Sequence, residues 1–141
     1  MERAINLNSL VTMVNQLNTA ISTTEEIRKT NDSQIITLLM DGTIHRFECT
    51  FDICWKLIQR WLKENRSREE AENPRSRKDL FRMAARCSLI RDPLAWFEYG
   101  EARNLTSHTY NMEQADITYN LALRFAGDAA FLLKKLEEAN D

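Results

Sequence analysis

Residues 103–110, RNLTSHTY, bring three side chains capable of chemistry close together in the chain: Arg103, His108 and Tyr110. Arginine is a permanent cation whose planar fork suits phosphate oxygens, and histidine titrates near neutral pH and moves protons. Without a metal, this pair could promote attack of a ribose 2′-hydroxyl on the adjacent phosphate, with His108 as base or acid and Arg103 stabilising the developing charge. The need for a 2′-hydroxyl would restrict the reaction to RNA.

The local backbone decides whether Arg103 and His108 can act together. On a regular helix the steps between them add up to about 140°, so their side chains would point in different directions. The intervening residues are poor helix formers, because Asn, Ser and Thr favour caps and turns. We therefore expect the helix to end near Arg103, which would let His108 approach it, with Asn104 and Ser107 as supporting residues. From spacing alone, a solvated turn whose polar side chains cap helix ends also fits.

A second feature is the positive charge between residues 75 and 91. This segment has six Arg and Lys residues and a single Asp, which gives it a local charge of +5 in a chain of net charge −2. On a helix, four of the cations would share one exposed face: Arg75, Lys78, Arg82 and Arg86. Such a stripe could contact a phosphate backbone, RNA or an acidic partner. An ordinary solvated helix face would have the same composition.

The composition excludes several classes of protein. Three Gly and two Pro in 141 residues leave little room for the tight turns of all-β or α/β folds, and no Gly-rich loop is present to bind phosphates. Cys49, Cys54 and Cys87 lack the spacing of a zinc site or a disulfide framework, so we expect reduced, buried thiols. We also expect no metal, no cofactor, no membrane span and a cytoplasmic location, since the chain has no long apolar segment and no apolar signal core.

Hydrophobic residues recur at spacings of three and four, which is typical of amphipathic helices. We predict a first helix over residues 3–23, a polar connection over 22–32, and a second helix over 33–65 begun by Asn31 with Gln34 or by Asp32 alone. Asn73-Pro74 and Asp92-Pro93 each indicate the start of a further helix, and Asn111 with Gln114 indicates the start of the last. The predicted fold is all-α, a five-helix antiparallel up-and-down bundle that forms a single domain over residues 1–141.

The second helix has one competing interpretation. Asp41-Gly42 lies between β-branched and apolar residues, as in a β-hairpin, but no third strand is visible to stabilise one. We therefore favour a continuous helix, whose aromatic residues Phe47, Phe51 and Trp55 form a core stripe. Three residues off that stripe could contact a partner subunit: His45, Arg46 and Glu48.

Two blocks of the chain, IHRFECTFDICWKLIQRWL and RNLTSHTYN, together resemble the nucleotidyltransferase substrate-binding family of the HEPN superfamily, whose branch of ribonuclease toxins includes HepT. The resemblance covers nearly the whole chain and includes the Arg-x4-His-x-Tyr form through Arg103, His108 and Tyr110. The chain departs from the family pattern in its second helix at three positions: His45 replaces the usual Gln, Asp52 the usual Glu, and Cys54 the usual Ala.

The resemblance implies a helical bundle that pairs into a homodimer and acts with a minimal nucleotidyltransferase encoded beside it. It also implies a metal-independent ribonuclease toxin in which Arg103 and His108 are catalytic. The transferase would silence the toxin by transferring AMP to Tyr110, because an added nucleotide places a competing phosphate beside Arg103 and His108. A non-catalytic subunit that binds a substrate or nucleotide for the transferase is the alternative.

Overall fold

The computed structural model describes residues 4–66, 76–106 and 111–140 of the chain. Within these residues all regular structure is helical, and the hairpin interpretation of residues 35–47 is excluded because they lie in one uninterrupted helix. The helices are α1 (Asn8–Ile27), α2 (Ser33–Asn65), α4 (Arg77–Arg86), α5 (Pro93–Thr106) and α6 (Met112–Asn140). The predicted all-α bundle of five helices is therefore confirmed.

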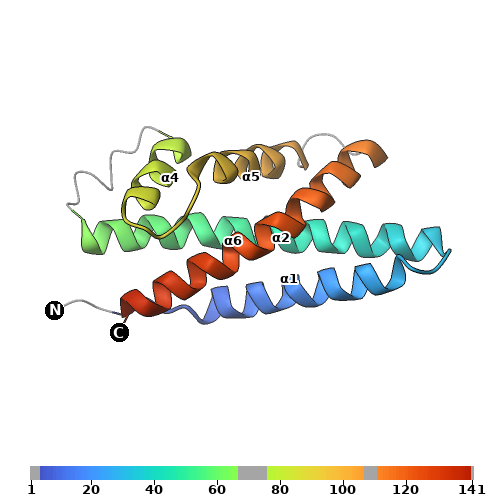
Figure 1. Cartoon of the computed structure of the whole chain (residues 1–141), viewed down its shortest axis with the longest axis horizontal. Coiled ribbons are helices and arrows are strands. Elements are labelled where there is room, and N and C mark those ends of the chain that lie inside the picture. Colours follow the sequence, from blue (N-terminus) through green and yellow to red (C-terminus); the bar gives the residue numbers. More distant parts are fainter. Residues whose placement is uncertain (1–3, 67–75, 107–110, 141) are drawn as a thin grey trace.

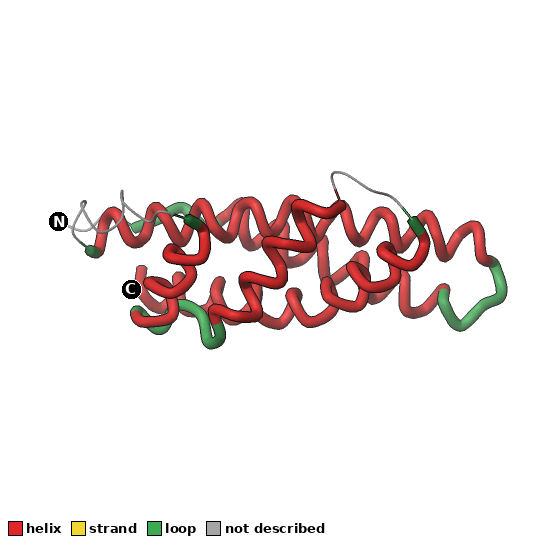
Figure 2. The backbone as a smooth tube through the Cα atoms, turned by 90° about the horizontal axis from the view of Figure 1, so that it is seen from above, coloured by secondary structure: helices red, strands yellow, loops and turns green. Residues whose placement is uncertain are grey.

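The longest helix, α2, is the centre of the bundle, because it packs against α1, α4, α5 and α6. Figure 1 shows α1 antiparallel to α2 along one side, α6 crossing both, and α4 and α5 along the opposite side of α2. The long helices all run lengthwise through the molecule, as the view from above also shows (Figure 2). The two ends of the described chain meet where Ile5 N–H donates to Asn140 Oδ1 at 3.0 Å and Asn140 Nδ2 donates to the Ile5 carbonyl at 2.8 Å.

An aromatic cluster joins α2, α5 and α6. Phe125 of α6 lies at its centre and makes edge-to-face contacts with Phe47, Trp96 and Tyr99 at centroid distances of 5.1, 5.6 and 5.1 Å. All four side chains are at most 1% exposed. Edge-to-face pairs add about 0.5–1.5 kcal/mol beyond the burial of their area, so this cluster fixes α5 relative to α2.

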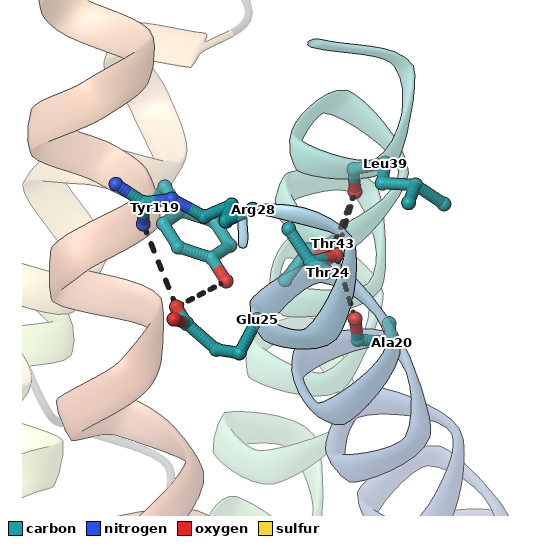
Figure 3. Close-up of polar contacts among 7 residues, drawn as sticks. All are labelled: Ala20, Thr24, Glu25, Arg28, Leu39, Thr43 and Tyr119. Atoms are coloured by element: carbon teal, nitrogen blue, oxygen red, sulfur yellow. Dashed lines mark hydrogen bonds and ion pairs between the residues drawn. The ribbon is translucent and has the colours of Figure 1, made fainter. Parts of the chain in front are cut away.

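A polar cluster joins α1 to α2 and α6 near one end of the bundle (Figure 3). The buried hydroxyls of Thr24 and Thr43 lie 3.0 Å apart, and each is also within hydrogen-bond distance of the carbonyl four residues earlier. Since each hydroxyl carries one proton, the pair shares two protons among these three contacts. Beside them, Tyr119 Oη donates to Glu25 Oε1 at 2.8 Å. Arg28 Nη1 lies 3.5 Å from the same carboxylate oxygen, and its guanidinium lies over the Tyr119 ring at 5.3 Å.

Three of the predicted helix starts are confirmed by side-chain caps. Asp32 Oδ1 accepts from Ile35 N–H at 3.2 Å at the start of α2, without the alternative Asn31 cap. Asp92 Oδ1 accepts from Leu94 N–H at 3.0 Å beside the start of α5, and Asn111 Oδ1 accepts from Gln114 N–H at 2.7 Å before α6. Each bond satisfies a backbone donor that the first turn of a helix leaves without an intrahelical partner.

The predicted bounds of α1 were wrong at both ends. The helix begins at Asn8, and the described residues before it are not helical, although Ile5 and Leu7 are buried in the core. It continues to Ile27, through part of the segment predicted as a connection. The reason is tertiary, because the polar residue Thr24 is fully buried against Thr43 and is not a solvated turn residue.

The predicted start of α4 was also wrong, because the helix begins at Arg77 and not at Pro74. Its cap is Ser76, whose Oγ accepts from Asp79 N–H at 3.3 Å. The cap predicted at Asn73 lies outside the described residues. The helix ends in a Schellman motif: Leu89 N–H donates to the Ala84 carbonyl and Ser88 N–H to the Ala85 carbonyl, both at 3.0 Å. Ser88 takes the left-handed position of that motif, with φ of 64°.

The cysteine prediction is correct for one residue of three. Cys54 is fully buried, and burial raises the pKa of its thiol well above the ordinary value. Cys49 and Cys87 are only partly buried, so the expectation of three buried thiols was wrong. All three are free thiols.

Candidate functional site

The guanidinium of Arg103, near the end of α5, is held by two carboxylates of α2. Arg103 Nε donates to Asp52 Oδ1 at 3.2 Å and Nη2 donates to Asp52 Oδ2 at 3.1 Å, while Nη1 donates to Glu48 Oε2 at 2.9 Å. The hydrogen bonds to Asp52 raise the pKa of Arg103, against a smaller opposing effect of partial burial. The side chain is 26% exposed, so the guanidinium lies at the surface in a fixed plane.

Helix geometry explains how α2 presents these carboxylates. Glu48 and Asp52 are four residues apart, so they lie one turn from each other on the same face. Each directly follows a buried phenylalanine of the core stripe, Phe47 or Phe51, which places it at the edge of the core. From the sequence, Glu48 was predicted only as a possible partner contact, and Asp52 was not predicted to be part of the site. The signal that would have found them is this pair of carboxylates at the spacing of one helical turn.

A polar cleft of about 290 Å³ adjoins Arg103. It lies between α2, α4 and α5, and its lining residues are Asp52, Trp55, Lys56, Arg77, Arg103 and Asn104. The guanidinium of Arg77 lies over the Trp55 ring, 4.6 Å from its centroid. Trp55 was predicted as core, but it is only partly buried and forms part of the cleft wall. Its buried indole Nε1–H has no hydrogen-bond partner in the described part of the chain.

The charges around this cleft leave a small positive excess. Lys56, Arg77 and Arg103 contribute three positive charges, and Glu48 and Asp52 contribute two negative charges. The two carboxylates outweigh the single charge of Arg103, so the net positive charge arises from Lys56 and Arg77. An anionic group of modest charge, such as a single phosphodiester, suits this balance.

Three of the four residues of the predicted basic stripe lie on the single helix α4. Lys78, Arg82 and Arg86 are exposed on α4, as expected, but Arg82 Nη1 is bound to Asp79 Oδ1 at 3.1 Å. Lys78 Nζ and Arg82 lie over the Phe97 ring, at 5.6 and 5.2 Å from its centroid. Arg75 lies outside the described residues. The cation that α4 contributes to the cleft is Arg77, which was not among the four predicted phosphate contacts.

Only part of the predicted motif lies within the described residues. Arg103 and Asn104 both line the cleft, whereas Ser107, His108 and Tyr110 lie outside the described residues. The prediction that α5 ends near Arg103 was wrong, because the helix continues to Thr106. Helix packing outweighs the weak propensity of this segment, since Tyr99 and Ala102 are buried and Arg103 is held by α2.

The described residues hold no candidate metal site, because they contain no group of three or more His, Cys, Asp and Glu side chains arranged to bind an ion. None of the helices formed by residues 4–66, 76–106 and 111–140 is long and apolar enough to cross a membrane.

The fold and the site together define a class of protein: an all-α bundle with a polar, arginine-containing cleft formed by α2, α4 and α5. Residues 6–138 match the family described as nucleotidyltransferase substrate binding protein like, and the chain belongs to that family. The resemblance noted in the sequence is thus confirmed for the family.

Individual proteins support the same assignment. The chain is 33% identical to the probable ribonuclease HepT of Haemophilus influenzae over 102 residues, which are 72% of this chain and 70% of that protein. The solved structure of HI0074 from Haemophilus influenzae, described as the fold of a substrate binding domain of a nucleotidyltransferase, superimposes with a TM-score of 0.86. It is 29% identical and the match covers 94% of this chain and 99% of that one. A protein from Thermus thermophilus superimposes with a TM-score of 0.63 at 30% identity, covering 85% of this chain and 98% of that one.

Proposed function

We propose that this protein is a metal-independent endoribonuclease of a two-component toxin–antitoxin-like system, and that it acts with a minimal nucleotidyltransferase. The observation that carries the proposal is the position of Arg103, which two carboxylates hold in a fixed plane at the wall of a polar cleft. The similarity to a probable ribonuclease HepT supports the activity. The similarity to a substrate binding domain of a nucleotidyltransferase supports the partner.

In the proposed reaction, His108 removes the proton of a ribose 2′-hydroxyl, and the 2′-oxygen attacks the adjacent phosphorus. The bond from phosphorus to the 5′-oxygen breaks, and that oxygen leaves as a hydroxyl after it accepts a proton, which the protonated His108 returns directly or through water. The products are a 2′,3′-cyclic phosphate and a 5′-hydroxyl end. Arg103 stabilises the charge that develops on the phosphate oxygens, and its fixed orientation reduces the reorganisation needed to do so. Asn104, at the same wall of the cleft, supports the substrate beside it, with Ser107 in the same role.

The proposed regulation acts through Tyr110. Its phenol oxygen would attack the α-phosphate of ATP bound to the transferase, which releases pyrophosphate and leaves AMP on the tyrosine. Because Tyr110 is two residues from His108 in the sequence, the added phosphate would compete with RNA for the cations of the cleft.

We further propose that the active form is a homodimer. Several large apolar side chains are exposed at the start of α2, the end of α5 and the start of α6, namely Ile35, Leu38, Leu105, Met112 and Ile117. Two of them, Leu105 and Met112, flank the motif segment 107–110 in the sequence. An association surface that covered these side chains would remove their apolar area from water. Light scattering should give the mass of a dimer, and Leu38→Glu, at a side chain that is 70% exposed, should shift it toward the monomer. A wild-type monomer at micromolar concentration would contradict the proposed homodimer.

The alternative is a non-catalytic subunit that binds a substrate or nucleotide for the transferase. The observation in its favour is that Glu48 and Asp52 compensate the charge of Arg103, which suits a structural role for this arginine as well as a catalytic one. The two functions differ in whether RNA is cut.

The deciding experiment incubates the purified protein with RNA in EDTA, beside His108→Ala and Arg103→Ala variants. The proposal predicts cleavage that persists in EDTA and is lost in both variants. Intact RNA with the wild-type protein, together with measurable binding of the transferase or of a nucleotide, would favour the binding subunit.

A further inference from the structure

A second cavity adjoins the polar cleft and differs from it in character. Its volume is about 120 Å³, and its wall is formed by Phe81, Trp96, Phe97 and Gly100. Phe81 and Trp96 are each 1% exposed, so they form the floor, whereas Phe97 is only partly buried and forms a side. Arg77 and Asn104 line both cavities, so the apolar pocket and the polar cleft share one rim.

From this arrangement we infer that the apolar pocket holds an unpaired nucleobase of a single-stranded RNA whose neighbouring phosphate lies in the polar cleft. This inference rests on the proposed function and names the class of its substrate. A nucleotide joins a flat, weakly polar ring to an anionic group, and the paired cavities match these two parts. Duplex RNA does not fit, because its bases are stacked and paired and are unavailable to a pocket.

The polar residues at the rim suit this occupant. Asn104 offers both a donor and an acceptor, and Glu101 offers an acceptor for an exocyclic amino group. Arg77 lies between the two cavities, where it can contact the sugar–phosphate backbone. Its planar guanidinium is also a surface on which a base can stack.

The charges around Phe97 add a second argument. Lys78 and Arg82 lie over its ring at 5.6 and 5.2 Å from the centroid. Both are exposed, long and flexible side chains, so a base can replace them on the ring without disturbing the core. Once displaced, they lie beside the incoming strand, where their charges attract its phosphates.

The test measures binding of a labelled, short single-stranded RNA by fluorescence anisotropy. All titrations use the His108→Ala background, so that the RNA stays intact. Phe97→Leu removes the stacking surface and keeps apolar bulk, and it should weaken binding about tenfold, as expected for the loss of one base–aromatic stack. The matched control is Phe131→Leu. Phe131 is also partly buried and also lies beneath an arginine and a lysine, at 4.6 and 5.4 Å, but it does not line the pocket.

A second arm leaves the protein unchanged, so it does not depend on the folding of the Phe97 variant. RNA that carries abasic sites should bind about tenfold more weakly than intact RNA, and with this RNA the Phe97→Leu substitution should have no further effect. The inference is overturned if the Phe97→Leu and Phe131→Leu variants bind the RNA with equal affinity, or if the protein binds intact and abasic RNA equally well. It is also overturned if adenosine monophosphate binds as tightly as the RNA strand. Failure of the proposed function is seen separately, as intact RNA in the EDTA assay with the wild-type protein.

Discussion

Asp52 of α2 and Arg103 of α5 are joined by two parallel hydrogen bonds, from Nε to Oδ1 at 3.2 Å and from Nη2 to Oδ2 at 3.1 Å. A carboxylate bound in this way restricts both the position and the plane of the guanidinium. Because α2 is the central helix of the bundle, this contact ties the candidate site to the rigid part of the fold. Loss of the contact should therefore affect activity more than stability.

Asp52 is predicted to position Arg103 rather than to contact the substrate. Asp52→Asn should lower kcat for RNA cleavage by about tenfold to a hundredfold with little change in KM, because a misplaced guanidinium stabilises the transition state poorly. The free energy of unfolding should fall by only about 1 kcal/mol or less, since the pair is partly exposed to solvent. The measurement is steady-state cleavage kinetics beside chemical denaturation.

The control for Asp52 is Glu98→Gln. This change removes another carboxylate bound to an arginine, the exposed pair Arg124–Glu98 at 3.3 Å, and it should leave cleavage unchanged. Asp52→Glu restores the charge and should recover most of the lost rate. A fall in cleavage that is equal in Asp52→Asn and Asp52→Glu would argue against a positioning role.

Tyr119 is predicted to ionise late in an alkaline titration. Burial, together with the hydrogen bond to Glu25, raises the pKa of Tyr119 to about 12, above the value of about 10 for a free tyrosine. The protonated hydroxyl therefore stabilises the fold below pH of about 10, and this contribution is lost as the pH rises toward 12. Near pH 8, Tyr119→Phe should lower the free energy of unfolding by about 1 kcal/mol. The loss is no larger because Glu25 is partly exposed, so solvent weakens its interaction with the hydroxyl.

Two measurements check the assignment of Tyr119. Ultraviolet absorbance should show that Tyr119→Phe removes a tyrosinate step near pH 12, and denaturation should show that the stability difference shrinks above pH of about 10. Burial, with the hydrogen bond to Asp128, also raises the pKa of Tyr99, so a late step should remain in the variant. Loss of a step near pH 10 instead would contradict the assignment.

Ser88 is predicted to be a site of removable strain. Its φ of 64° lies in the left-handed region, which a residue with a Cβ enters at a cost of about 1–2 kcal/mol. Ser88→Gly should raise the free energy of unfolding by about 1 kcal/mol after the greater freedom of glycine in the unfolded chain is included. Ser88→Ala keeps the Cβ and should give no gain. Thermal denaturation of both variants tests this, and a gain in the alanine variant would point to another cause.

Thr24 and Thr43 are predicted to be energetically coupled. Their hydroxyls lie 3.0 Å apart in a buried position, so each single change to Val should cost about 1 kcal/mol by leaving its partner with fewer hydrogen bonds. The double variant should lose less than the sum, with a coupling of about 0.5–1 kcal/mol. Thr50 is the control, because it is buried and bonded to the Arg46 carbonyl within its own helix. Thr24→Val and Thr50→Val should therefore be additive.

The sequence was sufficient to predict the architecture, because the periodic apolar residues and the caps Asp32 and Asn111 indicate helices directly. It was less reliable where tertiary contacts override local preference. Thr24 has the composition of a loop residue but is buried against Thr43, and the segment after Arg103 favours a turn by propensity but stays helical to Thr106. In both cases the deciding contacts come from residues distant in the sequence.

The sequence predicted only part of the candidate site, because the other part depends on contacts between residues that are distant in the sequence. Arg103 and Asn104 were selected from the motif, and both line the cleft. Glu48 and Asp52 were not assigned to it, because their role depends on how α5 docks on α2, which a single sequence does not reveal. Arg77 was likewise passed over in favour of its neighbours, since the orientation of α4 decides which of its cations faces the cleft.

A DNA oligonucleotide that carries one ribonucleotide, incubated with the protein in EDTA, measures whether cleavage uses the ribose 2′-hydroxyl. We predict a single cut directly after the ribose, a 2′,3′-cyclic phosphate on one product and a 5′-hydroxyl on the other, and no cut with the His108→Ala variant. Three results would contradict the proposed reaction. They are cleavage of an all-deoxy strand, products with 5′-phosphate ends, and failure to cut both this oligonucleotide and an all-RNA strand of the same sequence.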